Sequence, residues 1–344
     1  MKKILLVATI YRVGERIYTT IPKLSDIYDI DVYKTAQMGN EIIWYGNNDF
    51  RSIFDEMYEP FIKNSFTELP NLNEYDMILV DDDRPRNGIS QIYTEAHKLD
   101  IPVISNYHGS GDLNKNVLER NLKCWDKTFL FGKKDYTSYT NLSVDSDDKF
   151  LIGGIPANDS LKKYEITNTH ILVIVNFLGN RTSPYSVQVD SDFISMVGLV
   201  ELQKEFNKKV VFKLKSRYDH PYPDRDINYL KTIVPSGLDY EIVIDCKNDN
   251  KLICDSFIVI SAPSTLALKS VQKGIPTILI KDSGQIGCFF DYDGLTELNI
   301  QKIFDEIERQ YTDGRDTDFI LNTIEGGLEY NSTEKYIKEI RNII

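Results

Sequence analysis

The stretch that decides the fold is SFIVISAPSTLALKSVQKGIPTILI, residues 256–280. It opens with an apolar, β-branched run, passes through a turn of small and hydroxyl residues, and reaches Gly-Ile-Pro before a second apolar run. This pattern predicts a buried strand, a helix that begins near Thr265, and a second buried strand. A helix between two such strands is the unit from which parallel α/β sheets are built.

The same alternation of apolar runs and longer amphipathic stretches continues along most of the 344 residues. One series of runs ends at KFLIGGIP, and a second begins at HILVIVNFLG. Glycine, proline and polar residues fill the segment 153–169 between them, which indicates a domain junction. The sequence therefore predicts two Rossmann-like α/β domains, residues 1–155 and 156–328.

A terminal helix is predicted over residues 329–344, and we expect it to cross back to the N-terminal domain. Asn331 precedes Glu334 by three residues, a spacing like that of a capping box with Asn in the capping position.

Composition and charge narrow the class of protein. No run approaches the roughly 20 apolar residues that a membrane-spanning helix needs, so we expect a cytoplasmic protein without a transmembrane segment. The four cysteines show no CxxC or CxxH spacing, which favours free thiols over zinc or disulfides. A net charge of -12 disfavours a nucleic acid held by bulk electrostatics, although it does not exclude a local basic groove.

The turn before the predicted helix places Ser264 and Thr265 at a helix N-terminus, where backbone N–H groups and the helix dipole favour a phosphate. The alternative interpretation is that Ser264 only caps the helix. Because the carboxyl ends of parallel strands meet at one edge of a sheet, cations that follow the neighbouring strands are further candidates for a donor phosphate site. These cations are Arg181, Lys213, Lys215 and Arg217.

For proton transfer, His108 in NYHGSGD is the leading candidate for a general base. It follows a predicted buried strand, and the glycines after it let the backbone turn sharply. Asp112 is expected to orient His108 or to act in its place. A purely structural histidine is the alternative.

Asp82 and Asp83 follow the apolar run YDMILV, and Gly14 follows the first predicted strand, so all three are expected on the acceptor side. Asp81, Asp82 and Asp83 are consecutive in the sequence. The side chains of three consecutive residues do not point the same way, so no metal site is predicted there. Asp291 and Asp293 in FFDYDG are expected to contact the donor sugar or the ribose, with a plain turn as the alternative.

The strand, S-x-x-S-T, helix, G-x-P, strand series resembles the donor-nucleotide segment of GT-B transferases. Four more pieces follow the family's order, namely NYHGSGD, FLFGKKDYTSY, GGIPANDSL and VVFKLKSRYDHP. Together they span roughly residues 100–295 and resemble most the CDP-glycerol glycerophosphotransferase and capsular-polysaccharide transferase group. The resemblance implies a GT-B architecture, two Rossmann-like domains facing a central cleft, and metal-independent transfer that uses no cofactor besides the nucleotide-sugar co-substrate.

Two features depart from the resemblance. Lys269 stands where many GT-B enzymes carry a glutamate that often contacts the donor ribose, so ribose recognition is open. Where the relatives read K-x-H-P, this chain reads Lys213-Leu214-Lys215, and His220 follows only later.

The leading hypothesis is a glycosyltransferase that moves a sugar from a nucleotide donor, with UDP as the guess, to a hydroxyl acceptor. A polysaccharide, a teichoic-type polymer, a lipid-linked glycan and modified DNA are all candidate acceptors. The alternatives are a CDP-glycerol-type glycerophosphotransferase, a glycosyltransferase of hydroxymethylated DNA bases, which needs base flipping, a nucleotide-sugar epimerase that uses no acceptor, and a noncatalytic nucleotide- or glycan-binding protein.

Overall fold

The computed structural model describes residues 1–9, 11–35, 50–84, 89–107, 119, 122–142, 147–175, 198–214, 223–244, 249–281 and 289–344. These residues form two compact units. Unit 1 contains the described residues up to Asp159 together with Leu321–Ile344, and unit 2 contains those between Ser160 and Ile320. The chain thus passes into unit 2 after Asp159, close to the expected boundary at 155, and returns to unit 1 at Leu321, earlier than the expected boundary at 328.

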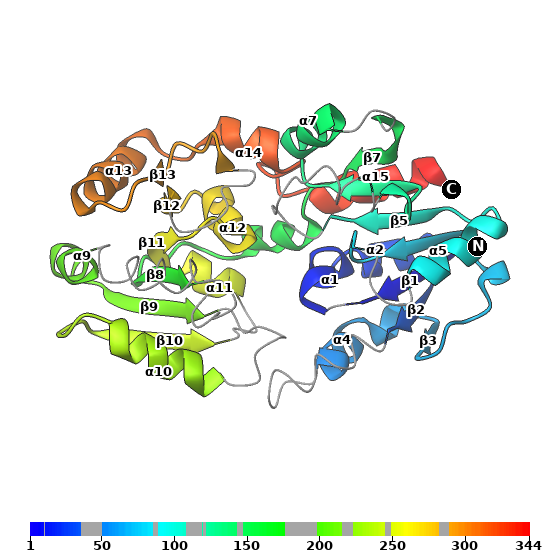
Figure 1. Cartoon of the computed structure of the whole chain (residues 1–344), viewed down its shortest axis with the longest axis horizontal. Helices are drawn as coiled ribbons and strands as arrows, with labels where there is room; N and C mark the ends of the chain where they lie inside the picture. Colours follow the sequence, from blue (N-terminus) through cyan, green and yellow to red (C-terminus); the bar gives the residue numbers. More distant parts are fainter. Residues whose placement is uncertain are drawn as a thin grey trace. The chain divides into compact units, whose positions relative to one another are not determined.

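Unit 1 is built on a parallel sheet whose described strands run in the order β3-β2-β1-β4-β5-β6-β7 (Figure 1). In the centre, Ile4 of β1 pairs with Ile30 on one side and with Met77 on the other. The strands are β1 (Lys3–Ala8), β2 (Asp29–Lys34), β3 (Asn64–Phe66), β4 (Met77–Val80), β5 (Val103–Asn106), β6 (Lys127–Leu130) and β7 (Phe150–Ile152).

Helices cover both faces of this sheet, which explains why its strands read as continuous apolar runs. Ile4 and Leu6 of β1 pack into one core, and Leu5 and Val7 pack into the other. The first core contains side chains from α1 (Tyr11–Tyr18), α2 (Ile21–Ser25), α4 (Phe50–Tyr58) and α15 (Ser332–Ile343). The second core contains side chains from α5 (Ile89–Lys98).

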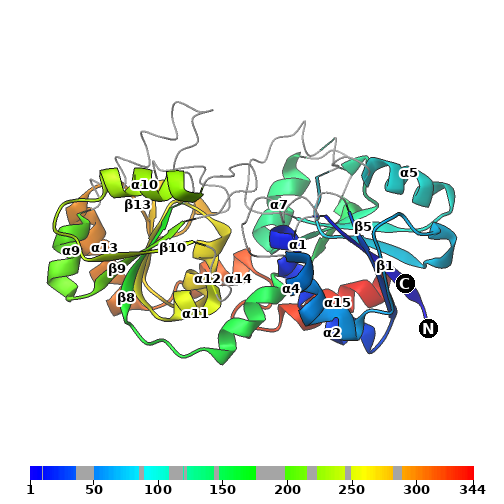
Figure 2. The same ribbon diagram turned by 90° about the horizontal axis from the view of Figure 1, so that it is seen from below.

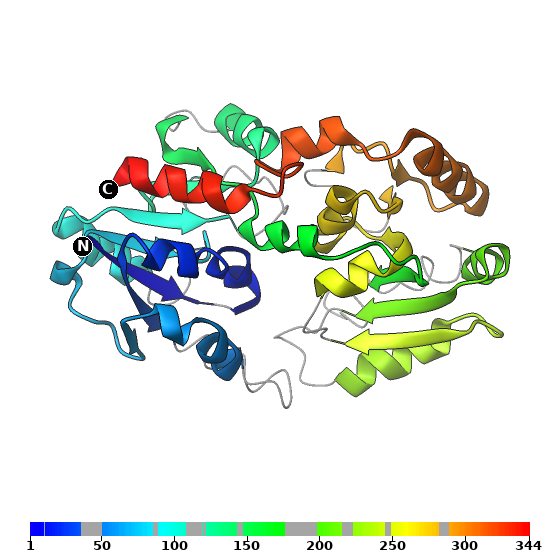
Figure 3. The same ribbon diagram turned by 180° about the vertical axis from the view of Figure 1, so that it is seen from behind.

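The terminal helix α15 belongs to unit 1, as the sequence predicts. Tyr336, Ile337 and Ile340 are buried in the same core as Ile4 and Leu6 of β1. Figure 3 shows α15 lying along this sheet, with both chain ends in the unit. The segment that follows unit 2 therefore completes the core that the first strand begins.

The predicted capping of α15 by the Asn331 side chain is wrong. Asn331 occupies the N-cap position, but its side chain makes no capping hydrogen bond. The carboxylate of Asp159 accepts hydrogen bonds from the backbone N–H of Ser332 at 3.0 Å and of Thr333 at 2.7 Å. A residue distant in sequence supplies the cap because the junction segment folds back against the helix start.

Unit 2 repeats the design, with described strands in the order β10-β9-β8-β11-β12-β13, every neighbouring pair parallel. One face is covered by α9 (Leu199–Phe206), α10 (Pro223–Ile233) and α13 (Ile300–Asp313), and the other by α11 (Asp249–Cys254) and α12 (Thr265–Lys273) (Figure 2). The strands are β8 (His170–Val175), β9 (Lys209–Leu214), β10 (Tyr240–Ile244), β11 (Ser256–Ser261), β12 (Thr277–Ile280) and β13 (Leu295–Thr296).

The other helices within the described residues are α7 (Lys133–Leu142), α14 (Thr317–Thr323), and the 3-10 helices η1 (Glu59–Phe61), η2 (Leu72–Glu74), η3 (Asp147–Lys149) and η4 (Pro156–Lys163). Cys254 is a buried free thiol. Among the described residues, no helix combines the length and apolar character needed to cross a bilayer.

Candidate functional site

The strand–turn–helix predicted from residues 256–280 is present in unit 2. β11 ends at Ser261, and α12 begins at Thr265. Ser264 has extended backbone angles, and its hydroxyl accepts a hydrogen bond from the Ala267 N–H at 3.2 Å, so it is the N-cap of α12. The helix ends at Gly274, whose φ of 82° suits a glycine. The N-terminus of α12 therefore lies at the carboxyl edge of the sheet, where the sequence predicts a phosphate.

Lys213 is near the carboxyl end of β9, but its ammonium has protein contacts. The side chain is 5% exposed. Its Nζ donates to the carbonyl of Leu214 at 3.2 Å and lies 3.8 Å from Oδ1 of Asp249, the first residue of α11. Lys213 therefore helps to fix α11 against the sheet, and its contact with a donor phosphate stays a prediction.

Lys269, the residue that departs from the GT-B pattern, ties α12 to α11. Its Nζ donates to Oδ1 of Asn250 at 2.9 Å, and the amide of Asn250 donates to the Ser160 hydroxyl at 2.6 Å. A glutamate at this position would place a carboxylate against the Asn250 oxygen. The lysine is thus part of a polar chain that joins two helices and η4.

Asp293 lies at the opposite edge of the unit 2 sheet from Ser264. β13 pairs with β12 in parallel, with Leu295 opposite Leu279. A residue that precedes β13 must therefore lie at the amino edge, because parallel strands all begin at the same side. The chain has already returned across the sheet when it reaches Asp293. The structure does not bring Asp293 together with Ser264, and Asp291 is in the same exposed turn as Asp293, so contact of either aspartate with the donor stays a prediction.

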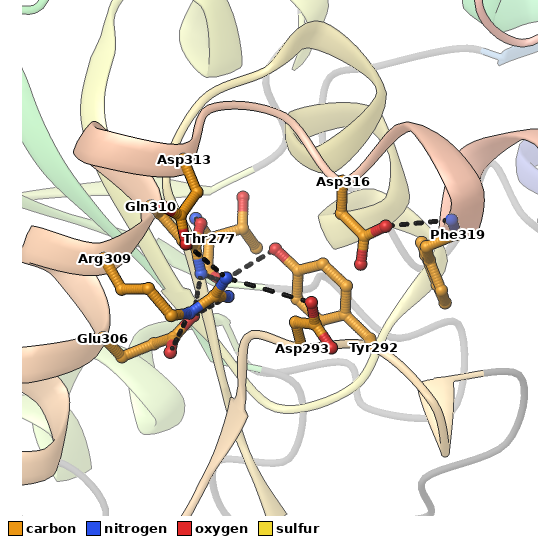
Figure 4. Close-up of polar contacts among 9 residues, drawn as sticks. All are labelled: Thr277, Tyr292, Asp293, Glu306, Arg309, Gln310, Asp313, Asp316 and Phe319. Atoms are coloured by element: carbon orange, nitrogen blue, oxygen red, sulfur yellow. Dashed lines mark hydrogen bonds and ion pairs between the residues drawn. The ribbon is translucent and has the colours of Figure 1, made fainter.

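Hydrogen bonds at this amino edge fix the start of β12 (Figure 4). Gln310 of α13 accepts from the Thr277 N–H at 2.7 Å and donates to the Thr277 carbonyl at 2.9 Å. The Tyr292 hydroxyl donates to the same carbonyl at 3.0 Å. Asp293 is 66% exposed, and its Oδ2 lies 3.8 Å from the Arg309 guanidinium.

A pocket of about 240 Å³ opens beside these residues, lined in part by Tyr292, Asp293, Arg309 and Asp313. Its volume is below the roughly 300 Å³ at which small-molecule sites usually begin. It lies at the amino edge of the sheet, so it is distinct from the carboxyl edge where parallel α/β sheets bind ligands.

In unit 1, Asp81 follows β4 and is buried among hydrogen-bond donors. Its Oδ2 accepts from the Thr9 N–H at 2.8 Å and from the Tyr18 hydroxyl at 2.5 Å, and its Oδ1 accepts from the Thr9 hydroxyl at 2.5 Å. Burial raises the pKa of Asp81 to about 7, against the opposing effect of these donors.

Asp82 and Asp83, which the sequence places on the acceptor side, are both buried. The carboxylate of Asp82 forms a bidentate ion pair with Arg84, at 2.9 Å from Nε to Oδ1 and 2.7 Å from Nη2 to Oδ2. The backbone carbonyl of Asp83 accepts from the indole N–H of Trp125 at 2.7 Å. These contacts hold the end of β4 in place, and a role toward an acceptor stays a prediction.

Gly14 makes room for a side chain of its own helix. A Cβ built at Gly14 would lie 2.1 Å from Cζ of Tyr18. The missing side chain therefore lets the Tyr18 ring fold back along α1, and a role of Gly14 on the acceptor side stays a prediction.

Asp135, in the first turn of α7, was not singled out from the sequence. It is 5% exposed, its Oδ2 has no hydrogen-bond partner, and burial raises its pKa to about 7. Its charge acts on the neighbouring hydroxyls of Tyr107 and Tyr139, whose rings are 5.5 Å apart between centroids. An acid at the start of the helix after β6 was the available signal, but its burial depends on how α7 packs.

Several predicted site residues lie outside the described residues. These are His108, Asp112, Arg181, Lys215 and Arg217. Their assigned roles stay predictions. Within the described ranges, no group of three or more His, Cys, Asp or Glu side chains is arranged to hold a metal ion.

Neither a protein-family model nor a curated protein sequence matches the chain. Solved structures do match over the full length. A UDP-GlcNAc 2-epimerase from Neisseria meningitidis, bound to UDP-GlcNAc, superposes with a TM-score of 0.63 at 15% identity, covering 99% of this chain and 100% of the other.

Two further structures are similar to the same extent. A UDP-GlcNAc 2-epimerase from Methanocaldococcus jannaschii gives a TM-score of 0.66 at 13% identity, covering 99% of this chain and all of the other. A putative UDP-N-acetylglucosamine 2-epimerase from Listeria monocytogenes gives 0.67 at 12% identity, covering 100% of this chain and 98% of the other.

The likeness is one of fold. It confirms the predicted fold class, two Rossmann-like parallel-sheet domains of GT-B type. The expectation that the chain is a glycosyltransferase is corrected, because the activity for which these structures are named is 2-epimerisation of UDP-GlcNAc. The finer resemblance to CDP-glycerol transferases gains no support from them.

Proposed function

We propose that the chain binds a UDP-linked sugar and epimerises it without a separate acceptor. The observation that carries this proposal is the N-terminus of α12, capped by Ser264 at the carboxyl edge of β11. Backbone N–H groups and the helix dipole at such an end favour a diphosphate. β11 lies beside β8, the first strand of unit 2, which is the point where the strand order reverses and where ligands bind in such sheets.

The similar structures support the choice of ligand. The Neisseria meningitidis epimerase holds UDP-GlcNAc, and a chain that shares its fold over the full length has the framework for the same class of ligand. Fold alone does not determine the reaction, so binding and turnover are tested separately.

Epimerisation by proton exchange requires a base that removes a proton from a sugar carbon and an acid that returns one to the opposite face. A carboxyl with a pKa near neutrality can take part in either step. Among the described residues, burial raises the pKa of both Asp81 and Asp135 to about 7. Asp81 already accepts hydrogen bonds from Thr9 and Tyr18, whereas Oδ2 of Asp135 has no hydrogen-bond partner, so Asp135 is the candidate for this step. His108 stays the other candidate from the sequence.

Binding is tested by thermal shift with UDP and UDP-GlcNAc, with GDP and CDP-glycerol as comparison ligands. We expect UDP and UDP-GlcNAc to raise the melting temperature by a few degrees, because a ligand that binds only the folded state stabilises it. A larger shift with CDP-glycerol would support the glycerophosphotransferase interpretation instead.

The chain offers a matched pair of variants for the diphosphate site. Ser264→Ala and Asn299→Ala each remove a helix cap in unit 2, since Asn299 caps α13 by accepting from the Lys302 N–H at 3.2 Å. Both lose about 1 kcal/mol of stability. We expect only Ser264→Ala to reduce the shift with UDP. If UDP raises the melting temperature of both variants equally, Ser264 is not part of the diphosphate site.

Turnover is tested with UDP-GlcNAc alone in D₂O, followed by NMR. We expect a second UDP-sugar isomer that carries deuterium at the inverted carbon, because the returned proton comes from solvent. Asp135→Asn should abolish this exchange and keep the UDP thermal shift. Binding without a new isomer, or without deuterium, would favour the noncatalytic interpretation.

A further inference from the structure

One carboxylate in unit 1 holds both ends of the segment that joins β1 to the end of α1. Thr9 directly follows β1, and Tyr18 is the last residue of α1. The Asp81 side chain, at the end of β4, accepts two hydrogen bonds from Thr9 and one from the Tyr18 hydroxyl, at 2.5 to 2.8 Å. Asp81 therefore ties α1 to the end of β4 both through Thr9, just before the helix, and through Tyr18, its last residue.

This three-way contact, which we call the Asp81 clamp, is shielded from water. Thr9, Tyr18 and Asp81 are each exposed by 1% or less. Hydrogen bonds in such low-dielectric surroundings are electrostatically stronger than in water. The Tyr18 ring also makes an edge contact with Phe54, with 4.9 Å between centroids. It packs directly against Gly14, where a side chain would leave no room for it. The position of α1 is consequently fixed by side-chain contacts beyond its own backbone.

The clamp lies at the carboxyl edge of the unit 1 sheet. Arg16, on the last turn of α1, reaches the carbonyl of Tyr107 after β5, with 3.4 Å between Nη1 and the oxygen. Asp81, Arg16 and Tyr107 line a cavity of about 10 Å³ at this edge, which is room for roughly one water. Burial and then the nearby Arg84 lower the pKa of Arg16 to about 10, so it stays a cation at neutral pH.

We propose that Asp81 is a positioning residue, whose clamp holds α1 and its Arg16 at the carboxyl edge of the unit 1 sheet, the edge where parallel α/β sheets bind ligands, in the arrangement that the proposed activity requires. The proposal rests on the proposed function. When only a fraction of molecules has the competent arrangement, the apparent affinity for the ligand falls by that fraction. Loosening the clamp therefore raises KM, while the chemistry in correctly arranged molecules proceeds as before.

The test compares two tyrosines of unit 1. Tyr18→Phe removes one donor of the clamp. Tyr75→Phe is the matched control, because the buried Tyr75 hydroxyl likewise donates to a buried carboxylate, that of Asp31, at 2.9 Å. Tyr75 precedes β4, so it lies at the amino edge of the same sheet. We expect Tyr18→Phe to raise KM for UDP-GlcNAc by about fivefold to tenfold with kcat within about twofold. Tyr75→Phe should leave both parameters near the wild-type values.

Variants at Asp81 separate hydrogen bonding from charge. In Asp81→Asn, the amide oxygen can accept from the Thr9 N–H and the Tyr18 hydroxyl, and the amide NH₂ can donate to the Thr9 hydroxyl. The clamp is then kept without its charge, so KM should stay within about twofold of wild type. Asp81→Ala removes every acceptor, so KM should rise at least as much as in Tyr18→Phe. Hydrogen exchange at the α1 amides should speed up in Tyr18→Phe and Asp81→Ala only.

Two results overturn the proposal and are distinguishable from each other. If the wild-type chain neither binds UDP nor converts UDP-GlcNAc, the proposed function fails, and the positioning role fails with it. If the wild-type chain is active but Tyr18→Phe matches Tyr75→Phe in KM, kcat and α1 exchange, the clamp has no positioning role and the proposed function stands.

Discussion

At the scale of single residues, the contribution of Asp81 to the stability of the folded protein depends on pH. Burial raises the pKa of Asp81 from its ordinary value of 3.8 to about 7 in the folded protein. Between these two pH values the folded state keeps a proton that the unfolded chain has already released. The contribution of Asp81 to stability is therefore full below about pH 4 and is lost as the pH rises through about 7.

Asp81→Asn should remove this dependence. We expect the variant to gain stability relative to wild type as the pH rises from about 5 to 8, by an amount that approaches about 3 kcal/mol at most. Urea unfolding at a series of pH values measures the difference. Asp305→Asn, on the exposed side of α13, is the control. Parallel curves for wild type and Asp81→Asn would contradict a raised pKa.

Lys269 shows how a residue's neighbours decide its interpretation. In the sequence it is only a substitution for a glutamate of the resembled family. In the structure its ammonium joins α12 to α11 through Asn250. The partner lies in a separate helix, so no pattern within the segment 256–280 indicates it.

At the scale of elements, helix ends are satisfied by different means. The start of α12 is capped locally by Ser264, three residues from the N–H that it accepts. The start of α15 is capped by Asp159, far away in the chain. Local capping can be read from a short pattern, whereas the second kind requires the path of the chain between the two segments.

We predict that Asp159→Ala destabilises the protein by about 1 to 2 kcal/mol, because two backbone N–H groups at the start of α15 lose their acceptor. Asn331→Ala should change stability by less than about 0.5 kcal/mol, since the Asn331 side chain makes no capping bond. Thermal or urea unfolding of both variants decides between them. A larger loss of stability in Asn331→Ala than in Asp159→Ala would show that the Asn331 side chain caps α15, as the sequence predicts.

At the scale of the whole molecule, the sequence by itself determined the two α/β domains, their parallel strands and the helix that begins at Thr265. The physical reason is that these features follow from patterns within a few dozen residues. A strand buried on both faces must be apolar throughout, as in Leu5 and Leu6 of β1, and a helix must begin with an acceptor for its first N–H groups.

Only the tertiary structure decided which residues share an edge of a sheet and which side chains fill the core. Asp293 and Ser264 both follow apolar runs, yet they lie at opposite edges, because the chain crosses back before β13. Asp81 looked like one of three equivalent carboxylates until Thr9 and Tyr18 were seen to enclose it. Such assignments depend on contacts between segments distant in sequence, which no local pattern encodes.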